Sequence, residues 1–443
     1  MTDSSVTVEK PASSSHRATD SLRTLVRSGS ATAIGLISAM ILGRGLGVSG
    51  YGAYQLLVNL ATQIGQICEA SVGTAFIALN RDGRLSEAQI DRSLVRFACQ
   101  ATIVAIPMVC LLTVILVDHA TFVWLAAACI IAVATIGQLL LLGSLRSHRQ
   151  ISQANFQMLC PPAISTALCS FLWLAEALTP INAVWTLAGS LVVSLAIGLS
   201  PAFLRRFLRR ASRPIDLQTG VVSARQLLSV GWRASVAKLA QLLIYRFDLF
   251  LIAAMMGSES IGLYVPAVFL ASQLNQLGDA VGFVLLPDIA RGRADVSQAC
   301  KACRLVLVPS IIAGATLAVL SPWLFAAVWG RDFSGAALPF LLLLPGYVVL
   351  TPVRAVSAYL NVATEFRATM KASLGGVVTN IVLNIALIPK FGTAGAATAT
   401  TAALLVVCGL LTTGLHRESG EGWKSCWLPR LEDIRQALRV IRR

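Results

Sequence analysis

Long apolar stretches separated by short polar segments run along most of this chain of 443 residues. Each stretch is close to the roughly 20 residues that a helix needs to cross a bilayer. Open strands leave backbone groups unpaired in lipid, and the alternating pattern of a membrane barrel is absent, so we expect helices. The expected spans cover residues 25–46, 53–79, 97–117, 120–142, 154–175, 181–204, 227–256, 261–286, 305–329, 336–360, 372–388 and 392–415.

Composition agrees with a lipid-facing surface. The chain is 56% hydrophobic and only 13% charged, whereas soluble domains carry about 25% charged residues. The predicted fold class is therefore all-α: a polytopic membrane protein with about twelve transmembrane helices, each close to the length that a bilayer requires.

The basic residues predict the orientation in the membrane. If the N-terminus is cytoplasmic, 29 of the 36 Lys and Arg residues fall on the cytoplasmic side, four lie within spans, and only Arg44, Arg331 and Lys390 face outward. Such a bias places both termini in the cytoplasm. It also explains the net charge of +15 through topology and attraction to anionic headgroups. We therefore expect membrane lipids and no nucleic acid as partners, and a bacterial cytoplasmic (inner) membrane as the location.

The two halves of the chain resemble each other at a shift of 210 positions. Residues 47–70 align with 257–280 with nine identities in 24 positions. The aligned pairs include Gly47 with Gly257, Gly52 with Gly262, Tyr54 with Tyr264, Gln63 with Gln273, Gln66 with Gln276, and Glu69 with Asp279. Because an even number of helices separates the copies, the repeat is parallel, and it predicts two six-helix lobes related by a pseudo-two-fold axis along the membrane normal.

This repeat divides the chain into five segments. Residues 1–24 form a polar cytoplasmic tail, 25–204 an N-lobe, 205–226 a basic cytoplasmic linker, 227–415 a C-lobe, and 416–443 a cytoplasmic tail. Apolar and basic positions alternate at helical spacing in the last segment, which predicts an amphipathic helix in the headgroup layer.

Polar side chains gather inside the spans, where a charge at mid-bilayer costs at least about 2.5–3.5 kcal/mol on insertion scales. In the span 227–256, Lys238, Gln241, Tyr245 and Asp248 fall within one stripe of about 80° at helical spacing. We expect such a stripe to line a polar cavity between the two halves.

The candidate site residues fall into two groups. The predicted substrate cavity comprises Arg233, Lys238, Gln241, Tyr245, Arg246, Arg354, Gln63, Gln66, Gln273 and Gln276. The acidic residues predicted to bind a coupling proton or Na⁺, or to balance the arginines, are Glu69, Asp248 and Asp279. The alternative is that these groups pair with one another and hold the helices together.

No catalytic constellation emerges from the sequence. The four histidines lie in tails or loops, and no glycine-rich nucleotide loop is present, so ATP is not the expected energy source. The CxxC pair Cys300 and Cys303 has no second pair, and we expect neither metal binding nor redox chemistry there. Asn380 and Asn384 are one turn apart and are expected to make interhelical hydrogen bonds. The chain is predicted to be a transporter without a cofactor, not an enzyme.

Three stretches resemble a known family. Residues 43–82, 246–291 and 380–405 are similar to polysaccharide flippases, with an R-x-D … G-x-Y … P run at Arg246, Asp248, Gly262, Tyr264 and Pro287. The order of these motifs along residues 23 to 416 carries the resemblance. The family is that of the O-antigen or exopolysaccharide (Wzx-type) flippases of the multidrug/oligosaccharidyl-lipid/polysaccharide exporter superfamily.

The resemblance implies twelve to fourteen helices in two V-shaped lobes that work by alternating access. It implies an undecaprenyl-pyrophosphate-linked oligosaccharide as cargo, moved to the periplasmic leaflet for lipopolysaccharide or exopolysaccharide synthesis. A polysaccharide polymerase and chain-length proteins are possible partners. The basic residues Lys238, Arg246, Arg233 and Arg354 are candidates to hold the pyrophosphate.

Several alternatives remain open at this point. A drug or cation antiporter of the same superfamily is the runner-up, although the mostly cationic cavity candidates suit an anionic cargo. A lipid II flippase is a second alternative. A membrane polymerase or ligase acting on lipid-linked sugars is less consistent with the sequence, because the expected external loops are too short to build a catalytic domain.

Overall fold

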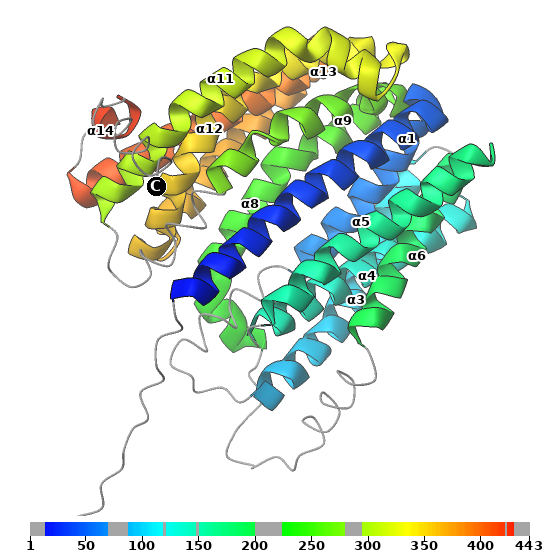
Figure 1. Ribbon diagram of the computed structural model, residues 1–443, viewed down its shortest axis with the longest axis horizontal. Coiled ribbons are helices and arrows are strands. Elements are labelled where there is room, and N and C mark those ends of the chain that lie inside the picture. Colours follow the sequence, from blue (N-terminus) through cyan, green and yellow to red (C-terminus); the bar gives the residue numbers. More distant parts are fainter. Residues whose placement is uncertain are drawn as a thin grey trace, which may run out of the picture.

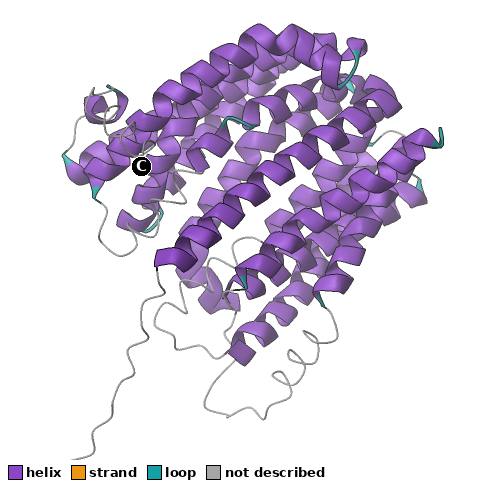
Figure 2. Cartoon of the chain, in the orientation of Figure 1, coloured by secondary structure: helices purple, strands orange, loops and turns teal. Residues whose placement is uncertain are grey.

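The computed structural model describes residues 14–69, 87–117, 121–147, 150–199, 224–279, 295–420 and 423–428. Every regular element within these ranges is a helix (Figure 2). In chain order they are α1 Ser14–Glu69, α3 Glu87–Leu116, α4 Phe122–Ser147, α5 Ile151–Leu174, α6 Pro180–Gly198, α8 Ala224–Met256, α9 Ser258–Ser272, α11 Val296–Val328, the 3₁₀ helix η1 Arg331–Ala336, α12 Ala337–Ala363, α13 Arg367–Ser419 and α14 Trp423–Trp427. The prediction of an all-helical chain is confirmed.

Nine helices of the described residues are long and apolar enough to cross a membrane. Two of them, in α1 and α13, are too long for one crossing and contain a kink at a glycine with positive φ, Gly47 at 66° and Gly392 at 59°. Each kink falls at a boundary that the sequence predicts between two spans. The 15-residue α9 is shorter than a full span. Twelve crossings therefore agree with the helices seen, but the full number stays a prediction.

The kink of α1 and the start of α9 show the repeat in three dimensions. Gly47 and Gly257 both have positive φ, 66° and 83°, a conformation that other residues adopt only with strain. A Cβ on Gly52 would overlap the carbonyl of Ser258, and a Cβ on Gly262 would overlap the carbonyl of Val48. A shift of 210 positions exchanges these two contacts, so the segments meet reciprocally. Such reciprocity is the geometry that a pseudo-two-fold axis produces.

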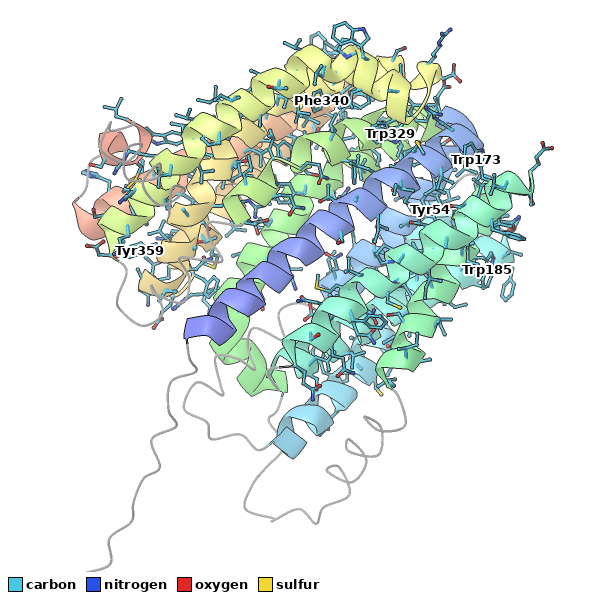
Figure 3. The ribbon with its side chains drawn as sticks, in the orientation of Figure 1. Tyr54, Trp173, Trp185, Trp329, Phe340 and Tyr359 are labelled. Atoms are coloured by element: carbon cyan, nitrogen blue, oxygen red, sulfur yellow. A yellow bond between two sulfur atoms is a disulfide. The ribbon has the colours of Figure 1, made fainter. Side chains whose placement is uncertain are left out.

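The helices form two groups that lie side by side (Figure 1). In the N-terminal group α1 packs against α3, α4, α5 and α6, and in the C-terminal group α13 packs against α8 and α12. Contacts between the groups are concentrated where α1 meets α9. Trp329, the residue directly after α11, covers this contact region. Its ring packs against Gly43 of α1 and Phe269 of α9 (Figure 3).

Large apolar side chains cover much of the exterior. Ile103 of α3, Phe122 of α4, Leu174 of α5 and Trp323 of α11 are all exposed. Exposed apolar patches of this extent are unfavourable in water and mark a surface that another apolar phase covers. The exterior therefore supports the interpretation of a multi-pass membrane protein.

Near its start, α11 binds the short helix α14. Cys300 forms a disulfide with Cys426 of α14, and Arg304 donates a hydrogen bond to the Ser425 carbonyl. Cys303, the other cysteine of the CxxC pair, is buried and unbridged. The predicted amphipathic helix of the tail lies almost wholly outside the described residues, as do most of the linker 205–226 and Pro287.

Candidate functional site

Three of the four cations predicted for the cavity form ion pairs. Lys238 Nζ lies 2.9 Å from Glu69 Oε2, and Arg233 Nη1 lies 3.1 Å from Glu365 Oε2. Arg354 pairs with Asp279. The alternative that charges pair with one another therefore holds for these three.

The three pairs differ in what they join. Lys238 of α8 and Glu69 of α1 connect the two halves, with the Glu69 side chain only 7% exposed. Arg233 pairs within the C-terminal half with Glu365, which is 79% exposed. The first pair ties the halves together, whereas the second lies at the surface.

Arg246 stands apart from these cations. None of the ion pairs within the described part of the chain involves it. Its guanidinium lies within electrostatic range of Tyr51 of α1, Asp248 of α8 and Tyr347 of α12. Arg246, on α8, therefore lies within electrostatic range of one tyrosine of the N-terminal half and one of the C-terminal half.

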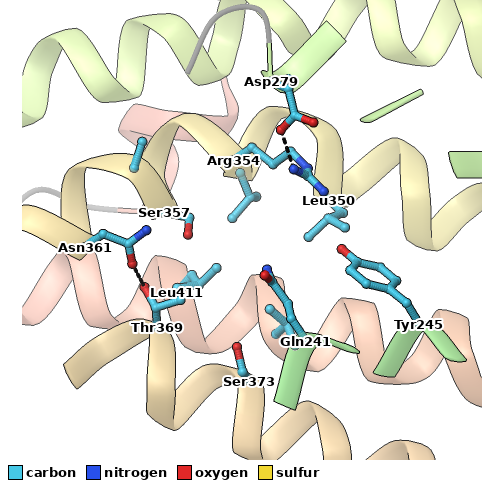
Figure 4. A pocket seen from close by; sticks show the side chains of 14 residues that line it. Gln241, Tyr245, Asp279, Leu350, Arg354, Ser357, Asn361, Thr369, Ser373 and Leu411 are labelled. Atoms are coloured by element: carbon cyan, nitrogen blue, oxygen red, sulfur yellow. Dashed lines mark hydrogen bonds and ion pairs between the residues drawn. The ribbon is translucent and has the colours of Figure 1, made fainter. Parts of the chain in front are cut away.

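A cavity of about 280 Å³ lies between α8, α12, α13 and the segment just after α9. Its polar lining consists of Gln241, Tyr245, Asp279, Arg354, Ser357, Asn361, Thr369 and Ser373 (Figure 4). Leu350, Val353, Val407 and Leu411 supply much of its apolar lining. The sequence predicts a cavity between the halves, but all lining residues of this cavity belong to the C-terminal half.

The Arg354–Asp279 pair is positioned by a close approach of two backbones. A Cβ on Gly278 would overlap the Thr351 carbonyl of α12, so glycine lets the segment before Asp279 lie against α12. Asp279 then meets Arg354 one turn further along α12. The Arg354 guanidinium also contacts the Tyr245 hydroxyl. These contacts hold one wall of the cavity in place.

Deeper in the same half, Asp248 is part of a buried hydrogen-bond network. Its carboxylate accepts from the Tyr264 hydroxyl, from Thr400 Oγ1 at 3.0 Å and from the Leu249 N–H at 2.9 Å. Asn380 donates to Thr400 at 3.2 Å. Because this bond crosses the kink of α13, the expected interhelical role of Asn380 is confirmed.

Asn384 extends this network. It donates to Asn380 one turn away at 3.0 Å, and its own Oδ1 is buried without a partner in the described residues, so the expected interhelical bond of Asn384 is not seen there. The network as a whole offers carboxylate, hydroxyl and amide oxygens, which are the ligands of hard cations.

Of the residues predicted for the substrate cavity, Gln241, Tyr245 and Arg354 line the cavity found here, together with the predicted acid Asp279. The cavity is not lined by the other charged candidates, which are Lys238, Arg233, Arg246, Glu69 and Asp248. The four remaining glutamines do not line it either. Gln63 is buried, Gln66 and Gln273 are partly buried, Gln276 is exposed, and Gln273 donates to the Phe269 carbonyl at 3.0 Å.

Sequence reasoning missed four polar lining residues. Ser357 and Asn361 are one turn apart on α12, and Thr369 and Ser373 are one turn apart at the start of α13. That spacing is the only signal that pointed to them, and Thr369 lies before the expected start of its span. Thr369 donates to Asn361 Oδ1 at 2.6 Å, which links the two helices at this wall.

Comparison with known proteins agrees with this picture. Residues 124–337 match the model of a family described as "Polysaccharide biosynthesis protein", which supports the resemblance to polysaccharide flippases over slightly less than half of the chain. No curated protein matches the chain.

Solved structures match over nearly the whole length. A lipid II flippase MurJ in an inward closed conformation matches with a TM-score of 0.71 and 12% identity, covering 95% of this chain and 92% of the other. An inward-facing multidrug resistance MATE transporter of the MOP superfamily matches with a TM-score of 0.63, 15% identity, and 88% and 95% coverage. A MOP superfamily transporter from Pyrococcus furiosus matches at 0.58, 16%, and 90% and 93%.

These similarities establish the class of fold. The chain has the two-lobed, all-helical fold of MOP superfamily transporters. The matched structures are named as a flippase and as transporters.

Proposed function

We propose that this protein is a flippase that moves an undecaprenyl-pyrophosphate-linked oligosaccharide from the cytoplasmic to the periplasmic leaflet by alternating access, for O-antigen or exopolysaccharide synthesis. The observation that carries the proposal is a cavity walled by hydrogen-bonding side chains within a helical bundle whose exterior is largely apolar. Each sugar hydroxyl costs several kcal/mol to bury in hydrocarbon without a partner. A headgroup of this kind therefore needs hydrogen-bonding side chains along its route through the protein, whereas its lipid tail does not.

Arg246 is the proposed contact for the pyrophosphate. The other three cations predicted for the cavity are paired with carboxylates, whereas Arg246 has no ion pair among the described residues. Tyr51, Asp248 and Tyr347 lie within electrostatic range of its guanidinium. A guanidinium binds phosphate oxygens through several charge-assisted hydrogen bonds. Arg246 is placed between elements of both halves, where a cargo that passes between them would meet it.

The buried network around Asp248 supports a coupling role for a proton or Na⁺. Asp248 is held by donors from α9 and α13, so a change in its charge acts on contacts among three helices. A gradient of this ion across the membrane would then supply the energy for transport. The proposal also places the protein in the cytoplasmic membrane with both termini in the cytoplasm, beside a polymerase and chain-length proteins.

The test is export in cells of an Arg246→Gln variant. The change keeps a hydrogen-bonding side chain but removes the charge, and charge-assisted bonds are worth about 1.5–3 kcal/mol. Polysaccharide at the cell surface, normalised to protein in the membrane, should fall about ten- to a hundredfold.

The matched control is Arg331→Gln, at an exposed arginine of η1, which should export normally. Full export by the Arg246→Gln variant would show that Arg246 does not bind the cargo. Export of a cationic drug in place of polysaccharide would favour the antiporter.

A further inference from the structure

The walls of the C-terminal cavity are polar but carry no net charge. The only ionic side chains among its lining residues are Arg354 and Asp279, which form an ion pair. The other polar lining groups are the amides of Gln241 and Asn361 and the hydroxyls of Tyr245, Ser357, Thr369 and Ser373. These groups present both hydrogen-bond donors and acceptors.

This mixture distinguishes between the two polar parts of a lipid-linked glycan. A pyrophosphate only accepts hydrogen bonds and carries negative charge, so it would use the donors of the lining but leave the carboxylate of Asp279 and the amide oxygens of Gln241 and Asn361 without donors. A sugar hydroxyl both donates and accepts. The cavity is therefore complementary to sugar hydroxyls and not to the pyrophosphate.

Two polar groups on opposite sides of the cavity have no hydrogen-bond partner among the described residues. Ser373 is only 1% exposed, and its Oγ has no hydrogen-bond partner in the described residues. Arg354 Nε is likewise buried and unpartnered. Buried hydroxyls and N–H groups nearly always have a partner, so these atoms indicate a ligand or water within the cavity. Figure 4 shows Ser373 beside Gln241, across the cavity from the Arg354–Asp279 pair.

The size of the cavity limits its occupant. At about 280 Å³, it lies just below the roughly 300–1,000 Å³ of sites that hold drug-sized ligands. It is too small for an oligosaccharide but large enough for one sugar ring. Asp279 is 45% exposed, so the ion pair marks the end of the cavity through which the rest of a glycan would leave.

We infer that this cavity is a subsite for one neutral sugar residue of the cargo, located inside the C-terminal half and separate from the pyrophosphate contact at Arg246. The inference rests on the proposed function and adds to it that two separate sites bind the sugar and the pyrophosphate. The sugar is recognised by neutral hydrogen bonds to Gln241 and Ser373, and the pyrophosphate by the charge of Arg246.

The test compares two lipids with the purified full-length protein in detergent, measuring complexes by native mass spectrometry. One probe is undecaprenyl pyrophosphate carrying a single N-acetylglucosamine, and the other is undecaprenyl pyrophosphate alone. The wild type should bind the glycosylated lipid more tightly. The double change Gln241→Met and Ser373→Ala should weaken its binding about tenfold, as expected for two neutral hydrogen bonds, and leave binding of the bare lipid unchanged.

Ser310→Ala is the matched control, because Ser310 is equally buried in α11 but donates to the Leu307 carbonyl of its own helix, 2.8 Å away. It should leave the binding of both lipids unchanged. A second cavity variant, Ser357→Leu, reduces the cavity from the opposite helix and should also lower only the binding of the glycosylated lipid.

Two results would overturn the inference in different ways. If wild type and variants bind both lipids equally, the sugar subsite is wrong while the lipid pyrophosphate remains a ligand and the proposed function stands. If the wild type binds neither lipid, the inference and the proposed function both fail.

Discussion

The ion pair between Lys238 and Glu69 should control how often the two halves separate at the end where it lies. It joins α8 to α1 at 2.9 Å and is the ion pair between the halves within the described ranges. At the other end, the halves meet through the glycine contacts of Gly52 and Gly262. Opening at the first end therefore has to break the ion pair, whereas opening at the other end has to separate the glycine contacts.

The size of the effect follows from burial. Removing one partner of a fully buried pair costs about 3–5 kcal/mol, and an exposed pair contributes about 0–1 kcal/mol. Here the Glu69 side chain is 7% exposed and that of Lys238 is 40% exposed, which places the pair between these limits. We estimate about 1–2 kcal/mol, equivalent to a factor of about 5–30 in the ratio of closed to open molecules.

The experiment changes Glu69→Gln and measures the distance between the halves. Spin labels at Gln100→Cys of α3 and Ala363→Cys of α12, both exposed positions, report the separation in a variant whose native cysteines are replaced. Glu69→Gln should shift the distance distribution toward longer values. Exchanging the charges, with Glu69→Lys and Lys238→Glu together, should restore the original distribution.

Arg233→Gln is the control, since it removes an ion pair within one half and its partner is largely exposed. Its distance distribution should match that of the wild type. If Glu69→Gln leaves the distribution unchanged, or if Arg233→Gln shifts it equally, the pair between the halves does not hold them closed.

Three further predictions follow from the same structure. Gly52→Ala and Gly262→Ala each force a Cβ into a backbone carbonyl. Both changes should lower the thermal midpoint of unfolding, because overpacking costs about 1–3 kcal/mol. Gly189→Ala, at a helix glycine with open space around it, should not lower it. Asp248→Asn should abolish the response of transport to an imposed proton or Na⁺ gradient; a retained response in vesicles would exclude Asp248 as the coupling group. A reporter active only in the periplasm should stay silent when fused after Arg443, and a strong signal would reverse the orientation.

Much of the fold could be predicted from the sequence, because apolar length and glycine position are local signals. The breaks before Gly392 and after 46 coincide with the kinks of α13 and α1. The alignment of Gly52 with Gly262 predicted equivalent places in two related lobes, and the structure places these two glycines in reciprocal contacts. Both features depend on the backbone conformation, which the positions of glycines and the lengths of apolar segments in the sequence indicate directly.

The site was less accessible, because a helical stripe gives the face of one helix and not the rotation of its neighbours. The stripe on α8 divides into three environments: Lys238 meets Glu69, Gln241 and Tyr245 line the cavity, and Asp248 is buried against Tyr264. The partners Asp279 and Glu365 come from segments whose approach depends on tertiary packing. For the same reason the structure, and not the sequence, located the cavity in the C-terminal half.

The proposed flippase activity can be measured directly in vesicles that contain the purified protein. A fluorescent lipid-linked oligosaccharide is placed in one leaflet, an ion gradient is imposed, and its arrival in the other leaflet is followed with a glycosidase that cannot cross the membrane. The account predicts gradient-dependent cleavage with the wild type and about ten- to a hundredfold slower cleavage with Arg246→Gln, from the loss of charge-assisted bonds. Cleavage no faster than in protein-free vesicles, under either gradient, would contradict it.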